Sequence, residues 1–286
     1  MSAPGTAPTF LVIGAQKCGT TWLAEVLRDH PDVFVVPEKE LHYYDDHTRH
    51  TRGLDWYLPH FAAGAGATAI GEATPNYLWT RATPHERARH HVSTDIPEKV
   101  HADFPDLKLL VCLRDPVDRA VSAYHHSIHA RYVAPSTRIL DAAPTFGIES
   151  AGRYAASLRD WFACWPRDRF HVLVYEDDIR TDAKRATVDA VCAFLGVGAL
   201  DDDAALEGVY NARPGSSYLR LHHRWPLVAR TLRRAVPAFE RLDRHPITVT
   251  DAERTELRRR FVDDVLDLEE LLGRDLSSWA TRRTAG

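Results

Sequence analysis

Two glycines separated by four residues, directly after an apolar run, constrain the fold of this chain more than any other feature. The run Thr9–Ile13 (TFLVI) is rich in β-branched residues, and Gly14-Ala-Gln-Lys-Cys-Gly19-Thr-Thr follows it at once. A helical pattern of apolar residues then continues to Leu27. Strand, glycine-bounded loop and helix in this order predict a loop whose backbone N–H groups, together with the helix N-terminus, bind a phosphate.

Four further apolar runs follow, with room for helices between them. The run Leu107–Leu113 (LKLLVCL) is almost unbroken, which is typical of a strand buried on both faces of a parallel sheet. Strands that alternate with helical patterns predict an α/β fold, with a P-loop-type parallel sheet and helices on both of its faces. The other three strands are expected at Val33–Val36, Ala69–Gly71 and His171–Tyr175.

Helix ends are also marked in the sequence. Asp115-Pro116 supplies a cap and a proline for the first helical turn. Thr250-Asp-Ala-Glu253 forms a capping box that opens a helix, and Gly273 ends it. Neither an internal repeat nor a low-complexity linker interrupts the chain. We therefore expect one domain over residues 9–280, with flexible ends at residues 1–8 and 281–286.

Composition limits the expected partners and location. The net charge of −4, from 36 lysine and arginine against 40 aspartate and glutamate residues, disfavours a protein that coats nucleic acid. The four cysteines include no CxxC pair, which is typical of a reduced compartment rather than a disulfide scaffold or zinc module. No stretch reaches the ~20 apolar residues that span a bilayer, and the N-terminus lacks signal-peptide features. We expect a cytoplasmic protein with no nucleic-acid and no membrane partner.

The phosphate loop departs from the form found in kinases and ATPases, GxxxxGK[ST]. Thr20 stands at the lysine position, and Lys17 lies three residues earlier, inside the loop. Only five of the 36 cationic residues are lysines, so arginine serves wherever any cation suffices. Lys17 therefore indicates a relocated cation with a specific role in phosphate chemistry, rather than a stray surface charge beside a glycine turn.

Two segments carry a resemblance to a known family. Gln16–Leu23 (QKCGTTWL) resembles the 5′-phosphosulfate-binding loop of sulfotransferases that use 3′-phosphoadenosine 5′-phosphosulfate (PAPS), and Leu109–Tyr124 resembles their 3′-phosphate-binding segment. The likeness is to the branch with the heparan sulfate N- and 3-O-sulfotransferase domains and their bacterial relatives. It implies PAPS as donor, PAP as product, and as binding residues Gln16, Lys17, Cys18, Gly19, Thr20, Thr21, Trp22, Arg114 and Ser122.

The chemistry of sulfuryl transfer suggests roles for individual residues. An ammonium in the loop, Lys17, can neutralise charge that develops on the leaving phosphate. Glu40 follows a strand end, where ligands bind in open α/β sheets. Taken alone it is a solvated loop acid, but the resemblance assigns it as general base, with His42 as a further catalytic residue beside the acceptor. The same resemblance implies as acceptor-binding residues Glu40, His42, Tyr43, Thr74, Pro75 and Asn76.

Two departures from the family pattern qualify the resemblance. Arg213 lies where the family has a basic loop over the nucleotide, and it is expected to contact the cofactor although the surrounding pattern is loose. Ala73 stands where the family usually carries a lysine that helps hold an anionic sugar, which disfavours acceptors of the glycosaminoglycan type. The histidine pairs match no metal-ligand spacing, and we expect no metal requirement.

Three functions remain open from the sequence. The favoured one is a PAPS-dependent sulfotransferase acting on a hydroxyl or amine of a glycan or small-molecule secondary metabolite. A P-loop nucleoside-triphosphate kinase or hydrolase would use the strand that ends before Asp115 as a Walker-B-like element, but Thr20 argues against it. The third is a non-catalytic nucleotide-binding module.

Overall fold

The computed structural model describes residues 6–90, 93–202, 204–208, 216–235 and 246–281 of the chain. It divides into two compact units, each assembled from two stretches of sequence. The first unit comprises Met1–Asp115 and Arg153–Tyr210, and the second comprises Pro116–Gly152 and Asn211–Gly286. The chain passes from one unit to the other after Asp115, Gly152 and Tyr210. The single domain expected over residues 9–280 stays a prediction.

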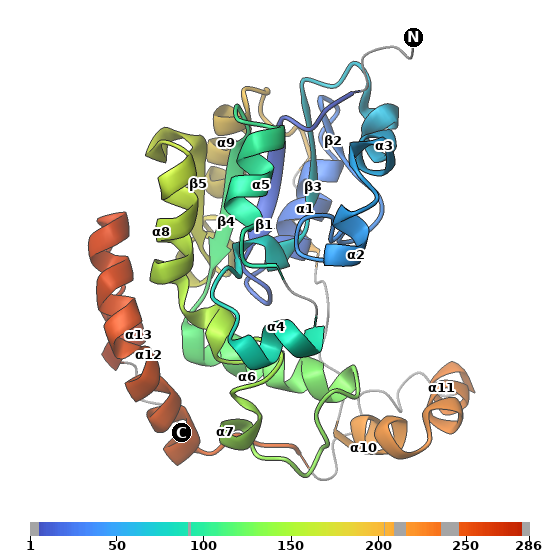
Figure 1. Ribbon diagram of the computed structural model, residues 1–286, viewed down its shortest axis with the longest axis vertical. Coiled ribbons are helices and arrows are strands. Elements are labelled where there is room, and N and C mark those ends of the chain that lie inside the picture. Colours follow the sequence, from blue (N-terminus) through green and yellow to red (C-terminus); the bar gives the residue numbers. More distant parts are fainter. Residues whose placement is uncertain (1–5, 91–92, 203, 209–215, 236–245, 282–286) are drawn as a thin grey trace. The chain divides into compact units, whose positions relative to one another are not determined.

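The first unit contains a five-stranded sheet in the order β2-β3-β1-β4-β5, in which every neighbouring pair is parallel (Figure 1). The four strands expected after the first are all present, and the predicted α/β class is confirmed. In β1 and β4 every residue but Lys108 is buried, because helices cover both faces. The strands are β1 (Phe10–Gly14), β2 (Val33–Val35), β3 (Ala69–Ala73), β4 (Lys108–Leu113) and β5 (Phe170–Val174).

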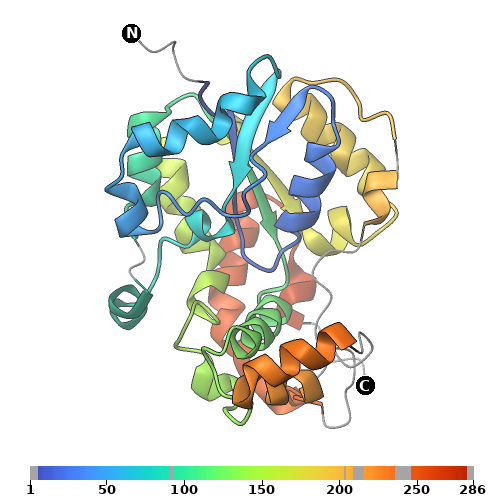
Figure 2. The ribbon, with the colours of Figure 1, turned by 90° about the vertical axis from the view of Figure 1, so that its right-hand side faces the viewer.

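Four helices form the layers on either side of this sheet. The helices α1 (Thr20–Arg28) and α9 (Lys184–Leu195) cover one face, and α5 (Ile96–Asp103) and α8 (Tyr154–Cys164) cover the other (Figure 2). Shorter pieces complete the unit, and they are α2 (His47–His50), α3 (Leu54–Tyr57), η1 (Leu58–Gly64), η2 (Pro75–Leu78), α4 (Pro84–His90), η4 (Arg167–Arg169), the π-helical turn η5 (Tyr175–Ile179) and η6 (Ala204–Glu207).

The second unit is helical in its described part. Its longest helix, α12 (Asp251–Leu272), begins with the predicted capping box between Thr250 and Glu253 and ends at Gly273, where φ is 61°. The other elements are α6 (Pro116–His129), α7 (Ile139–Ala142), η3 (Ser150–Gly152), α10 (Ser216–Arg224), α11 (Pro226–Ala235) and α13 (Ser277–Thr281). Among the helices described in both units, none is long and apolar enough to cross a membrane.

The strand order places the candidate site at the carboxyl edge of the sheet. From β1 the chain moves outward to β2, returns to β3 between them, and then crosses β1 to reach β4. The connections on the two sides of β1 therefore run in opposite directions, which makes β1 the switch point where open α/β sheets bind ligands. The loops after β1, β2, β3 and β4 carry the residues singled out in the first unit.

Candidate active site

The loop Ala15–Gly19 joins β1 to α1 and presents a helix N-terminus. Gly19 caps α1 with φ of 94°, a left-handed conformation that glycine adopts without steric cost. A Cβ there would lie 3.0 Å from side-chain atoms of both Tyr175 and Ile179. In the described chain no side chain caps α1, and its first turn holds no acidic residue. The positive end of the helix dipole therefore favours an anion here.

Contacts with β4 and α8 fix the shape of this loop. The Ala15 N–H donates to the carbonyl of Cys112 over 2.7 Å, at the end of β4. The buried Cys18 thiol lies 3.5 Å from the Tyr154 hydroxyl, which donates to the carbonyl of Arg114 over 3.0 Å. Trp22, predicted to bind the cofactor, is buried and donates its indole N–H to the carbonyl of Leu206.

Arg114 lies at the end of β4 and reaches the phosphate loop. Its Nη1 donates to the carbonyl of Lys17 over 3.4 Å, and its guanidinium lies 4.8 Å from the ring centre of Tyr175. Its buried Nε has no hydrogen-bond partner in the described part of the chain. A buried guanidinium N–H without a partner suits an anionic ligand. Ser122 is half-buried on α6 in the second unit, so its joint action with Arg114 stays a prediction, and Arg213 lies outside the described residues.

The three residues predicted to be catalytic share an unusual backbone conformation. Lys17, Glu40 and His42 have φ values of 70°, 62° and 52°, and they are three of the five non-glycine residues with positive φ in the described chain. A residue held in this region costs about 1–3 kcal/mol, and such strain concentrates at functional sites. The conformation lets Glu40 and His42, two residues apart, direct their side chains toward each other.

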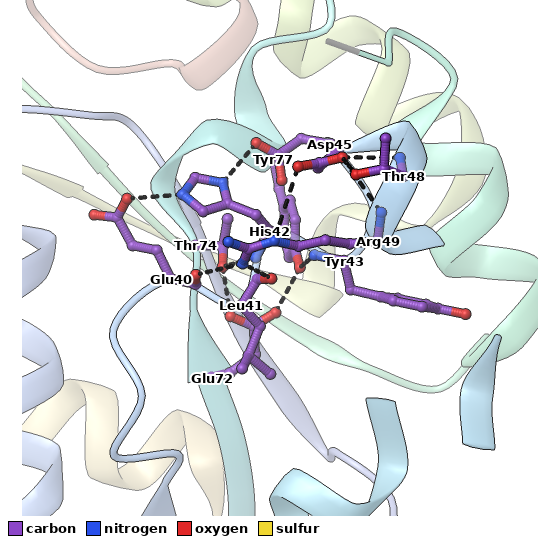
Figure 3. A network of polar contacts seen from close by, with 11 residues as sticks. Glu40, Leu41, His42, Tyr43, Asp45, Thr48, Arg49, Glu72, Thr74 and Tyr77 are labelled. Atoms are coloured by element: carbon purple, nitrogen blue, oxygen red, sulfur yellow. Dashed lines mark hydrogen bonds and ion pairs between the residues drawn. The ribbon is translucent and has the colours of Figure 1, made fainter. Parts of the chain in front are cut away.

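Glu40, His42 and Asp45 form a chain of ion-paired side chains after β2 (Figure 3). The Glu40 Oε2 lies 3.2 Å from His42 Nε2, and the Asp45 Oδ2 lies 2.8 Å from His42 Nδ1. Asp45 is buried, with 5% of its side chain exposed, whereas Glu40 retains 27%. The chain therefore runs from a carboxylate that solvent can reach to one that is buried.

The charges around His42 control its protonation. Burial of the imidazole lowers its pKa, but hydrogen bonds to Asp45 and Glu40 and the two negative charges outweigh burial and raise the pKa of His42 to about 10. At neutral pH the ring is an imidazolium that donates from both nitrogens. A doubly protonated ring cannot accept a further proton, so the geometry favours Glu40 as the base and His42 as the group that orients it.

Beneath this chain, a buried carboxyl from β3 joins the network. The Glu72 Oε2 accepts from the Thr74 hydroxyl over 2.6 Å, and Thr74 Oγ1 accepts from the His42 backbone N–H over 3.3 Å. The Glu72 Oε1 accepts from the Tyr77 hydroxyl over 2.7 Å. Glu72 is 1% exposed, and burial raises its pKa to about 7, against the lowering effect of hydrogen bonds from Thr74, Tyr77 and Tyr57.

The predicted acceptor residues around this network differ in exposure. Tyr43 is 2% exposed and stacks on Tyr57 at 4.5 Å between ring centres. Thr74 and Pro75 are buried, while Asn76 is half-buried. The acceptor contacts predicted for these four residues stay predictions.

Gly14 fixes how closely the segment after β3 approaches β1. A Cβ on Gly14 would lie 2.4 Å from the Leu78 Cβ and 3.0 Å from the Pro75 carbonyl oxygen. Only glycine admits η2 at this distance. The first glycine of the loop is therefore required by packing, and the second by backbone conformation.

Sequence reasoning missed three members of the site. Asp45 lies three residues after His42, and this spacing was the available signal. Glu72 and Tyr77 flank the predicted residues Thr74–Asn76.

In the described ranges no group of three or more histidine, cysteine, aspartate or glutamate side chains is placed to hold a metal ion. The predicted independence from metal awaits a direct test.

Curated relatives of the chain are sulfotransferases. Heparan sulfate glucosamine 3-O-sulfotransferase 6 of Homo sapiens is 33% identical over 205 residues, covering 68% of this chain and 55% of that protein. Heparan sulfate glucosamine 3-O-sulfotransferase 3B1 of Mus musculus is 33% identical over 171 residues, covering 56% and 39% respectively. The chain thus spans about half the length of the curated relatives it matches.

Solved structures agree with these sequence matches. The crystal structure of a sulfotransferase from Alicyclobacillus acidocaldarius is 26% identical with a TM-score of 0.66, covering 96% of this chain and 100% of that one. The sulfotransferase domain from the Synechococcus PCC 7002 olefin synthase, at 18% identity and a TM-score of 0.51, shares the fold. Residues 7–207, more than half of the chain, match the sulfotransferase domain family. The chain belongs to this family.

Proposed function

We propose that this protein transfers a sulfuryl group from PAPS to a hydroxyl or amine of a carbohydrate or secondary-metabolite acceptor. The observation that carries the proposal is the strained, ion-paired Glu40–His42–Asp45 chain, which follows β2 at the same sheet edge as the Lys17 loop. The kinase or hydrolase alternative is not favoured, because Thr20 stands at the lysine position and the relatives are sulfotransferases.

The residues of the loop suit an anionic nucleotide donor. Within the part of the chain that the structure describes, no side chain caps α1 and the buried Nε of Arg114 has no hydrogen-bond partner, and both observations favour a bound phosphate. Residues Gln16–Trp22 and Arg114 would hold the donor, and the sequence resemblance names Ser122 and Arg213 as further donor-binding residues. PAPS, when bound, supplies the sulfuryl group through its sulfur–oxygen bond and is released as PAP.

Each side chain of the network has one task in this reaction. The Lys17 ammonium neutralises the negative charge that forms on the phosphate oxygen as its bond to sulfur breaks. Glu40 takes the proton of the acceptor group as the acceptor oxygen or nitrogen bonds to sulfur. His42 holds the Glu40 carboxylate through Nε2, and Asp45 holds His42 through Nδ1. Buried Asp45 thereby fixes the orientation of the half-buried base, Glu40.

Acceptor class, metal independence and location complete the proposal. Ala73 leaves the end of β3 without the cation that suits a strongly anionic sugar, so we propose a neutral or weakly charged acceptor. We propose that Lys17 and backbone N–H groups neutralise the charge on the leaving phosphate, so the reaction needs no metal ion. A cytoplasmic location is proposed from the composition of the chain.

Transfer of radiolabelled sulfur from PAPS tests the proposal directly. The purified protein is incubated with labelled PAPS and a panel of neutral glycans, heparan oligosaccharides, phenols, alcohols and amines. We expect labelled product from a neutral acceptor, and its loss in Glu40→Gln. A protein that binds PAP but labels no member of the panel would support the non-catalytic module, and magnesium-dependent ATP turnover would support the kinase alternative.

A further inference from the structure

Glu72 is a fully buried carboxyl that the proposed reaction does not use. It lies on β3, is 1% exposed and approaches neither the acceptor side of Glu40 nor the phosphate loop through any hydrogen bond of the described residues. Burying a carboxyl costs free energy unless hydrogen bonds compensate. The hydroxyls of Tyr57, Thr74 and Tyr77 donate the hydrogen bonds that compensate this cost. The other groups that bind these hydroxyls indicate the role of the carboxyl.

Two of these hydroxyls connect Glu72 to consecutive backbone N–H groups. Through one oxygen, Thr74 links Glu72 to the N–H of His42, over 2.6 and 3.3 Å. Through the other, Tyr77 links Glu72 to the N–H of Tyr43, over 2.7 and 3.1 Å. Both hydroxyls donate to the carboxylate, so both must accept from the amides. Each link therefore runs from a backbone N–H through a hydroxyl to the Glu72 carboxylate (Figure 3).

The two amides belong to the strained segment that positions the catalytic residues. His42 has a positive φ of 52°, and Glu40 has one of 62°. Strained backbone persists only where surrounding contacts over-determine it. Arg49 adds a contact from the other side, by donating to the carbonyls of Leu41 and Glu40 over 2.5 and 3.4 Å.

We infer that Glu72 is a positioning residue, which acts through Thr74 and Tyr77 to hold the His42–Tyr43 backbone so that Glu40, His42 and Asp45 stay aligned. The inference rests on the proposed sulfuryl transfer for its kinetic consequence, but its structural part stands without that activity. Glu72 itself touches no reacting group.

The charge state of Glu72 supports this role. Burial raises its pKa to about 7, so the carboxyl changes charge near neutral pH. Once protonated, the carboxyl loses its charge and has to donate one hydrogen bond itself, so the bonds that it accepts from the three hydroxyls are weakened. The hydroxyls of Tyr57, Thr74 and Tyr77 donate hydrogen bonds to Glu72. Asp45 and Tyr44 interact with it electrostatically.

The first test measures the imidazole of His42 by NMR, in protein labelled with ¹³C-histidine. His42→Asn assigns the resonance. We expect Thr74→Val and Glu72→Gln to lower the pKa of His42 by at least one unit, because the ring loses its alignment with Glu40 and Asp45. Thr74→Ser keeps the hydroxyl and should keep the pKa of His42.

A matched control separates the loss of the hydrogen-bonded link from Glu72 to His42 from the general effect of removing a buried hydroxyl. Thr80 also donates to a carboxylate over 2.6 Å, that of Asp160, and is 3% exposed. Thr80→Val should leave the His42 titration unchanged. If Thr74→Val and Tyr77→Phe both fold and leave that titration unchanged, Glu72 does not position His42. If Glu72→Gln, Thr74→Val and Tyr77→Phe all fail to fold, the network is only structural and the inference is rejected.

The second test uses kinetics and PAP calorimetry. Displacing a catalytic group by about 1 Å costs on the order of 10²-fold in rate. Thr74→Val should therefore lower kcat about 10²-fold, with the KM for PAPS and the affinity for PAP unchanged, while Thr80→Val lowers neither. Equal losses in the two variants overturn the positioning role. If the unmodified protein transfers no sulfuryl group, the proposed function fails, and the His42 titration alone decides the role of Glu72.

Discussion

The elevated pKa of His42 predicts a specific dependence of stability on pH. The pKa rises from 6.5 to about 10 on folding, because hydrogen bonds and charges from Asp45 and Glu40 outweigh burial. The folded protein therefore retains a proton that the unfolded chain loses above pH 6.5. This contribution to the free energy of unfolding is fully present below pH 6.5 and is lost as the pH rises through 10.

The size of the effect follows from the same two pKa values. One bound proton changes the free energy of unfolding by about 1.4 kcal/mol per pH unit where only the folded state holds it. Between pH 7 and pH 9 this amounts to about 2.5 kcal/mol, and partial solvent exposure of the ring reduces it to about 2 kcal/mol. His42→Asn removes the titrating group, and asparagine tolerates the left-handed backbone at this position.

Urea unfolding at pH 7 and pH 9 measures the difference. We expect the advantage of the unmodified protein over His42→Asn to shrink by about 2 kcal/mol between the two pH values. His85→Asn, on the exposed surface of α4, controls for the loss of a histidine and should show no such change. An advantage that stays constant to within 0.5 kcal/mol, roughly the error of additive comparisons, would refute the ion-paired imidazolium.

Four further predictions concern the loop and the donor. Glu40→Gln should lose ~10²–10⁴-fold in turnover yet keep PAP affinity, whereas Lys17→Ala should lose ~10²–10³-fold and also bind PAPS less tightly, as single-turnover kinetics and calorimetry will show. Arg114→Ala should abolish any preference for PAP over AMP, and equal affinity in the unmodified protein would contradict the assignment. Gly14→Ala should lower Tm by several degrees, since its Cβ would lie 2.4 Å from that of Leu78. EDTA should leave sulfuryl transfer intact, and activity restored by added magnesium would contradict this.

The sheet could be predicted from the sequence because its strands are mostly apolar runs next to a strong boundary signal. Leu107–Leu113 became β4 nearly residue for residue, and the Thr250 capping box opens α12 as expected. The short helices α2 and α3 could not be predicted, since four residues contain too little apolar periodicity.

The site was predictable only in its residue types. The phosphate-loop motif and the family resemblance identified Lys17 and Glu40, but nothing in the sequence predicts that their φ values are positive. The alignment of Asp45 with His42 depends on that backbone reversal, and the charge on His42 depends on burial. Glu72 was overlooked because an acid at a strand end is ordinarily solvated, and only tertiary packing encloses it.

The left-handed backbone at Glu40 and His42 also limits how this protein can diverge. β-Branched and bulky residues are disfavoured there, so glycine, asparagine and aspartate are the replacements that the backbone accepts most easily. None of these three residues combines a negative charge with a side chain as long as that of glutamate. None of them has the two ring nitrogens of histidine. A saturation library at these positions should therefore be almost empty of active clones, and a new acceptor preference would have to arise from substitutions at other positions.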